Sequence, residues 1–138
     1  MSQTDFVVQR NAPVTRDEYD ALRITVGWNS LGAKTQQVLT QAYAHFSIRD
    51  EHRLFAYAHA ISDGLTDALL VDVMVHPDMQ GRGLGRKLVR YAIKALHADG
   101  IVFVQMVFDP SLEPFYRACG LHIASAGIAD KLDPKWQG

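Results

Sequence analysis

The spacing of apolar residues changes along the chain, and each change indicates a different kind of element. Residues 6–10 are rich in strand-forming side chains and predict a short first strand. Thr15 and Glu18 have the spacing of a capping box, in which each side chain accepts a hydrogen bond from the other residue's backbone N–H. Leu22 continues an apolar face toward Gly27, so the pattern predicts a helix between Thr15 and this glycine.

The middle of the chain begins with a short predicted helix over residues 34–42. From residue 43 the pattern changes to an alternation of apolar and polar residues, which is typical of strands. This alternation predicts three strands, over residues 43–49, 53–62 and 66–76. An Asp-Gly pair between the last two has the composition of a hairpin turn, so these strands are expected to be antiparallel neighbours.

The last part of the chain returns to helical spacing and then to apolar runs. Residues 83–98 form the clearest predicted helix, and residues 101–107 predict a strand covered on both faces. A short helix over residues 111–119 and one or two strands from residues 121–131 follow. We therefore predict a single domain over residues 1–138, of the mixed α/β class.

Composition supports one folded domain and disfavours several classes of partner. Of 138 residues, 48% are hydrophobic and 21% are charged, which is ordinary for a globular protein. The 14 Lys and Arg against 15 Asp and Glu leave a net charge of −1, so no overall basic field favours nucleic acid. No apolar run approaches the ~20 residues of a membrane span. The first residues do not resemble a signal peptide, so we expect a cytoplasmic protein that binds no membrane.

The cysteine and the histidines give no indication of a metal site. One cysteine excludes an internal disulfide and favours a reducing compartment. The six histidines are too far apart along the chain to form the closely spaced pair of a common zinc site. No metal is therefore expected.

The most informative segment is a glycine-rich turn between the third alternating strand and the clearest helix. It reads Gln80-Gly81-Arg82-Gly83-Leu84-Gly85-Arg86. Glycines let a backbone approach a ligand closely, and the first N–H groups of a helix are unpaired donors that attract anions. The turn has neither the GK[ST] end of a P-loop nor the spacing of a dinucleotide fingerprint. Arg82 and Arg86 lie at the start of the predicted helix, where their positive charges are unfavourable beside the positive end of the helix dipole. A bound anion would offset this repulsion, which favours a polyphosphate ligand.

Two short patterns lie on either side of this helix. Gln80, Gly83 and Gly85 form Q-x-x-G-x-G after a strand, and residues 115–120 read Phe-Tyr-Arg-Ala-Cys-Gly. These patterns and the element order resemble the GNAT superfamily of acyl-CoA-dependent N-acyltransferases over nearly the whole chain. Its second motif is commonly N-x-x-A-x-x-F-Y-x-x-x-G-F, whereas this chain has Asp109, Leu112 and Leu121 at the first, fourth and last positions.

The resemblance implies a fold and a donor site. The expected fold is a mixed sheet of six or seven strands, splayed at the fourth and fifth strands and flanked by about four helices. The backbone of Met74 and Val75 would bond the pantetheine arm of acetyl-CoA, and the amide of Val73 would polarise the thioester carbonyl. Asp109 and Tyr116 would also lie at the cofactor. The pyrophosphate would be held by the amides of Gln80, Gly81, Arg82, Gly83, Leu84, Gly85 and Arg86.

Several side chains are candidates for the chemistry. Tyr116 has the position of the family's general acid, although it could instead pack the last helix. Asp72 lies in an apolar strand and could act as a base, bind the amine or only fix a neighbouring segment. His59 and His45 are weaker base candidates, and Cys119 is interpreted as an apolar thiol at a helix end.

The acceptor pocket is expected from the loop after the first helix and from facing strands. Its candidates are Trp28, Asn29, Phe46, Tyr57 and Asp72, although Phe46 and Tyr57 could be core aromatics. The main hypothesis is an acetyl-CoA-dependent N-acetyltransferase for a small primary amine, with a homodimer possible. The alternatives are a protein lysine or N-terminal acetyltransferase and a non-catalytic acyl-CoA-binding module.

Overall fold

The computed structural model describes residues 6–138, which divide into two compact units. The first unit ends at Met106 and contains a mixed sheet in the order β1-β2-β3-β4-β5. The strands are β1 (Gln9–Arg10), β2 (Ala44–Arg49), β3 (Leu54–Ser62), β4 (Asp67–Val75) and β5 (Phe103–Gln105). Its helices are α1 (Arg16–Thr25), α2 (Thr35–Gln41) and α3 (Leu84–Ala98). The second unit, Val107–Gly138, contains α4 (Glu113–Ala118).

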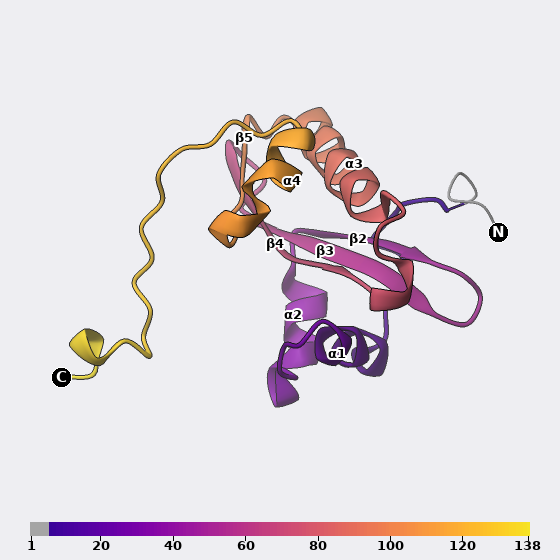
Figure 1. Ribbon diagram of the computed structural model, residues 1–138, viewed down its shortest axis with the longest axis horizontal. Coiled ribbons are helices and arrows are strands. Elements are labelled where there is room, and N and C mark those ends of the chain that lie inside the picture. Colours follow the sequence, from indigo (N-terminus) through magenta and orange to yellow (C-terminus); the bar gives the residue numbers. More distant parts are fainter. Residues whose placement is uncertain (1–5) are drawn as a thin grey trace. The chain divides into compact units, whose positions relative to one another are not determined.

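The helices of the first unit cover both faces of its sheet. α1 and α2 lie on one face and α3 lies on the other (Figure 1). Alternation along the strands assigns side chains to these faces, because neighbours along a strand point in opposite directions. Tyr57 of β3 meets Tyr19 of α1 edge to face, with 4.9 Å between ring centroids, whereas Phe46 of β2 lies 6.1 Å from Tyr91 of α3.

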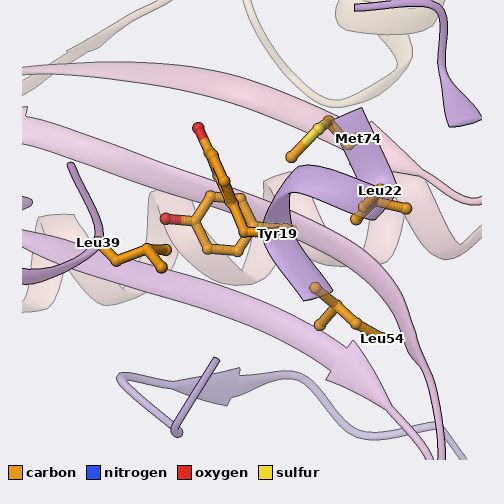
Figure 2. Packing of buried hydrophobic residues seen from close by; sticks show 6 residues of the cluster. Tyr19, Leu22, Leu39, Leu54 and Met74 are labelled. Atoms are coloured by element: carbon orange, nitrogen blue, oxygen red, sulfur yellow. The ribbon is translucent and has the colours of Figure 1, made fainter. Parts of the chain in front are cut away.

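A buried cluster holds α1 and α2 against the sheet (Figure 2). It consists of Tyr19, Leu22, Leu39, Leu54, Tyr57 and Met74. Tyr19 and Tyr57 are fully buried, and full burial of a large side chain contributes about 1.5–3 kcal/mol by the hydrophobic effect. The cluster therefore fixes the position of α1 above β3 and β4, where the candidate Asp72 lies.

The capping box predicted at the start of α1 is confirmed. The Thr15 hydroxyl accepts a hydrogen bond from the Glu18 N–H at 3.1 Å, and the Glu18 carboxylate accepts one from the Thr15 N–H at 3.2 Å. Val26 caps the other end, and Gly27 follows with φ +89°. Local signals at both ends thus set the length of this helix.

The end of the chain differs from the sequence prediction in two respects. β5 covers only three residues. Its first residue, Phe103, is 61% exposed and the preceding Val102 is 59% exposed, so this edge strand is not covered on both faces. Residues 121–131 form no strand, which leaves five strands in residues 6–138 rather than six or seven. Residues 124–127 are Ala-Ser-Ala-Gly, and such small side chains give a strand little to pack. Within the part of the chain described here, no helix is long and apolar enough to cross a membrane.

Candidate active site

The central feature of the site is a bulge in β4. Tyr57 of β3 pairs with Met74, and His59 pairs with Val71, so one residue of β3 faces two residues of β4, Asp72 and Val73. Asp72 has φ +54°, a left-handed conformation that few residues other than glycine adopt. Such strain persists only where the surroundings hold it, and bulges of this kind re-aim a side chain.

On the edge away from β3, β4 has a paired strand in residues 6–138 only along its first three residues. β4 pairs with β5 in parallel through Asp67, Ala68 and Leu69, and within the described residues this pairing ends at Leu69. Within the described residues no strand pairs with the rest of this edge, which passes the bulge and ends at Val75. Met74 points its side chain into the cluster of Figure 2, so only its backbone can bind a ligand along this edge.

Asp72 is held by groups from α1. Its Oδ2 accepts a hydrogen bond from the Tyr19 hydroxyl and lies 3.2 Å from Nη1 of Arg23. Burial, and then the bond to Asp72, raise the pKa of Tyr19, which keeps the phenol protonated as a donor. The Tyr19 hydroxyl and the Arg23 guanidinium thus hold the Asp72 side chain from the same helix.

Arg23 links this carboxylate to the loop after α1. Its Nε donates to the Asn29 carbonyl at 2.7 Å, and its guanidinium carbon lies 5.4 Å from the Trp28 ring centroid. Arg23 was not among the site residues predicted from the sequence. Its place one helical turn after Tyr19 was the available signal, because residues four apart share a helix face. The structure thus brings together Asp72, Trp28 and Asn29.

Two further side chains approach Asp72 from β3. The His59 Nδ1 lies 4.0 Å from Asp72 Oδ2 and 3.2 Å from the Tyr57 hydroxyl. Tyr57 belongs to this group and is fully buried, as is Phe46, which lies on the opposite face of the sheet against α3. The structure therefore does not bring Phe46 to the other acceptor candidates. His45 stacks on Tyr57 with 5.8 Å between ring centroids.

The glycine-rich turn joins β4 to α3 through two glycines in left-handed conformations. Gly81 has φ +77° and Gly83, the N-cap of α3, has φ +78°. The first bond of the helix runs from the Lys87 N–H to the Gly83 carbonyl at 3.1 Å. The amides of Leu84, Gly85 and Arg86 precede that bond, so they point outward as donors. No acidic residue stands in the first turn of α3.

Gln80 has a role that the sequence did not indicate. Its Nε2 donates to the Val75 carbonyl at 3.0 Å, which closes the turn onto the end of β4. That contact uses one carbonyl of the strand that we expected to bond the pantetheine arm. A pantetheine arm would therefore share the Val75 carbonyl with this side chain.

Tyr116 and Asp109 belong to the second unit. Tyr116 is 6% exposed and stacks on Phe108, with 4.3 Å between ring centroids. Burial raises the pKa of Tyr116 to about 12, so the phenol holds its proton at neutral pH. Asp109 caps a short turn by accepting a hydrogen bond from the Ser111 N–H at 2.9 Å. That bond lowers the pKa of its carboxyl.

Comparison with known proteins assigns this arrangement to a family. A family model described as an acetyltransferase (GNAT) domain matches residues 41–121. This chain belongs to the GNAT acetyltransferase family. It is accordingly an acyltransferase, and the mixed fold predicted for it is confirmed. The GNAT match begins just before β2 and ends after α4, so it includes the bulge, the glycine-rich turn and Tyr116.

Individual GNAT relatives extend the match toward the N-terminus. The uncharacterized N-acetyltransferase ycf52 of Gracilaria tenuistipitata var. liui is 30% identical over 123 residues, which cover 86% of this chain and 68% of that protein. Histone acetyltransferase TAP1 of Glycine max is 34% identical over 127 residues, which cover 81% of this chain and 54% of that protein. This chain thus spans little more than half the length of the second relative.

A solved GNAT structure agrees with the fold. An acetyltransferase of the GNAT family from Streptococcus pneumoniae TIGR4 superimposes with a TM-score of 0.75 at 19% identity. The match covers 93% of this chain and 99% of that one. GNAT enzymes use acetyl-CoA as co-substrate. Among residues 6–138 no group of three or more His, Cys, Asp or Glu side chains could hold a metal ion.

The Tyr19–Asp72 contact makes a testable contribution to stability. We expect Tyr19→Phe to lower the free energy of unfolding by about 1–2 kcal/mol, because it removes a buried donor from a carboxylate. Urea denaturation measures this change. Tyr43→Phe is the matched control, since Tyr43 donates to Asp99 at 2.8 Å in an exposed pair. An equal loss in both variants would contradict a special role for the contact at Asp72.

Proposed function

We propose that this chain transfers the acetyl group of acetyl-CoA to the primary amine of a small acceptor by direct attack. The observation that carries the proposal is the edge of β4 that has no paired strand in the described residues, which begins after Leu69 and leads to the glycine-rich turn. It offers a row of backbone groups followed by a set of outward amides. Acetyl-CoA has the matching form, because its extended pantetheine arm ends in a pyrophosphate.

The donor is proposed to bind along this path. The amides from Gln80 to Arg86 bind the pyrophosphate, which the helix dipole and the side chains of Arg82 and Arg86 favour. The pantetheine arm bonds the backbone of Met74 and Val75. The Val73 amide, at the bulge, donates to the thioester oxygen and stabilises the negative charge that develops there during attack.

The chemistry requires the removal of a proton from the amine and the return of one to sulfur. The amine nitrogen attacks the thioester carbon, a C–N bond forms, the C–S bond breaks, and the thiolate of CoA takes a proton. The Asp72 carboxylate attracts the acceptor ammonium, and the Tyr116 phenol gives its proton to the thiolate. The raised pKa of Tyr116 supports this role, because the phenol stays protonated until negative charge develops beside it.

The proposal is tested with a panel of primary amines and acetyl-CoA, with release of the CoA thiol as the readout. We expect turnover with small amines and none without an acceptor. Tight binding of acetyl-CoA with no turnover on any acceptor would instead support a non-catalytic acyl-CoA-binding module. Salt-sensitive binding to DNA without binding to acetyl-CoA would contradict the assignment of the glycine-rich turn.

A protein acceptor is the second candidate function. The similarity to a histone acetyltransferase of Glycine max favours it, because that relative's name states a protein acceptor. Adding a lysine-containing histone peptide and a peptide with a free N-terminus to the panel separates the two. A peptide that is turned over more efficiently than every small amine would support the second candidate. Cytoplasmic location and a homodimer stay predictions.

A further inference from the structure

A cavity open to solvent lies between α2 and the end of β3, on the sheet face that carries α1. Its volume is about 290 Å³, close to the ~300 Å³ lower end of ligand pockets. From α2 and the residues that cap its two ends, the lining residues are Lys34, Gln37, Val38, Gln41 and Ala42. Those from β3 are His59, Ile61 and Ser62. A cavity of this volume fits a small organic molecule.

His59 connects this cavity to the bulge in β4. Its side chain is 6% exposed, its Nδ1 lies near Tyr57 and Asp72, and the ring also lines the cavity. The carboxylate near Nδ1 favours a proton on that nitrogen. The other nitrogen, Nε2, is then left as an acceptor for a ligand in the cavity.

The surroundings of His59 keep its ring neutral. Burial lowers its pKa below the ordinary value, and His45 and Arg23 lower it further, whereas Asp72 opposes them. A neutral imidazole can receive a proton, and a protonated one cannot. The titratable groups that face it come from α1, β2, β3 and β4. They are Tyr19, Arg23, His45, Tyr57 and Asp72.

The lining of the cavity is complementary to an anion at its mouth. Lys34 supplies a cation, and Gln37, Gln41 and Ser62 supply hydrogen-bonding side chains. Of the residues described as lining it, none is Asp or Glu. A molecule with an acidic group at one end and an amine at the other would place its amine toward His59 and Asp72 and its acid toward Lys34.

We propose that this cavity is the acceptor site and that the acceptor is a small primary amine carrying a carboxylate or phosphate group. Lys34 binds this acidic group, and His59 receives the proton of the ammonium. The inference rests on the proposed function and names its substrate class. The ammonium gives one proton to His59 Nε2, which later releases it to solvent. The free amine then attacks the thioester carbon, and its nitrogen loses a second proton. The CoA thiolate takes up one proton, so one proton is released overall. The products are the N-acetylated acid, CoA thiol and one proton.

The substrate class is tested with matched acceptors that differ in the acidic group. The pairs are 4-aminobutyrate against butylamine, and phosphoethanolamine against ethanolamine. We expect kcat/KM to be at least about tenfold higher for one acidic member, the lower end of the gain from a close charge pair. Equal kcat/KM within both pairs would overturn this inference and leave the proposed function intact. No thiol release with any amine would overturn both.

The two residues are tested by substitution. Lys34→Gln is expected to raise KM about tenfold for the acidic acceptor, the loss expected for an unpaired anion, with KM for butylamine and for acetyl-CoA unchanged. The matched control is Lys94→Gln, because Lys94 is an exposed lysine of α3, which lies on the opposite face of the sheet. A similar rise in KM for acidic and neutral acceptors would overturn the role of Lys34.

His59→Gln keeps a polar side chain but cannot receive the proton. We expect kcat at pH 7 to fall at least about a hundredfold, the lower end of the range for a general base, with unchanged binding of acetyl-CoA. In the unmodified chain kcat/KM should fall as the pH drops below the ordinary histidine pKa, because His59 becomes protonated there. This acidic limb should be absent in the variant. An unchanged pH profile would overturn the role of His59.

Discussion

Replacing Gly83 with valine is expected to weaken the binding of acetyl-CoA by at least about a hundredfold, because a β-branched residue is strained at positive φ and its side chain blocks close backbone approach. Gly83 has φ +78° and is the N-cap of α3, where the outward amides begin. A pyrophosphate bound by these amides must lie against the backbone, in the space that a valine side chain would fill. Isothermal titration calorimetry measures the affinity directly.

A matched variant separates this effect from damage to α3. Gly100 also has a positive φ, +97°, at the other end of the same helix, and a Cβ there would meet nothing within 4 Å. Gly100→Val therefore imposes comparable backbone strain away from the glycine-rich turn. We expect it to lower stability and to leave the affinity for acetyl-CoA unchanged. Unchanged affinity in Gly83→Val would refute the assignment of the turn as the pyrophosphate site.

Replacing Tyr116 with phenylalanine is expected to lower kcat by about 100- to 1000-fold, within the range for loss of a general acid. The ring stacked on Phe108 stays, so the second unit keeps its packing and only the hydroxyl is removed. The affinity for acetyl-CoA should change little, because a proton donor to the departing thiolate acts after binding. Steady-state thiol release and calorimetry measure the two quantities separately.

The control for this variant removes a phenol elsewhere. Tyr91 on α3 is 43% exposed and has no role in the proposed chemistry, so Tyr91→Phe should retain the kcat of the unmodified chain. If Tyr116→Phe also retains it, Tyr116 acts only in packing. Retention of kcat together with loss of thermal stability would assign the residue entirely to the interior of its unit.

The parts of the fold that local signals determine could be predicted from the sequence. The capping box of α1 and the glycine-rich turn before α3 depend on residues within one or two helical turns of each other. The family resemblance predicted a splay at the fourth and fifth strands, and the pairing of β4 with β5 ends at Leu69 in the described residues. The prediction of one or two strands in residues 121–131 was wrong, because apolar positions at strand spacing do not create a strand without a partner to pair with.

The arrangement around Asp72 could not be predicted in the same way. The bulge is a single extra residue, and the apolar run on either side of Asp72 in β4 gives no sign of it. Arg23 and Asp72 are 49 residues apart, so their ion pair exists only after α1 has packed on the sheet. The candidates Asp72, Trp28 and Asn29 were named separately, and it is Arg23 that joins them.

The bulge in β4 also constrains how this chain can change in length. Val71 and Met74 are three residues apart, yet they pair with His59 and Tyr57 on the same face of the sheet. Deleting one residue between them would restore a regular strand and leave Met74 on its present face, but it would remove the bulge that directs Asp72 toward Tyr19 and Arg23. Natural or engineered variation in length is therefore expected in the hairpin turns, and β4 should keep its length even where its side chains are exchanged.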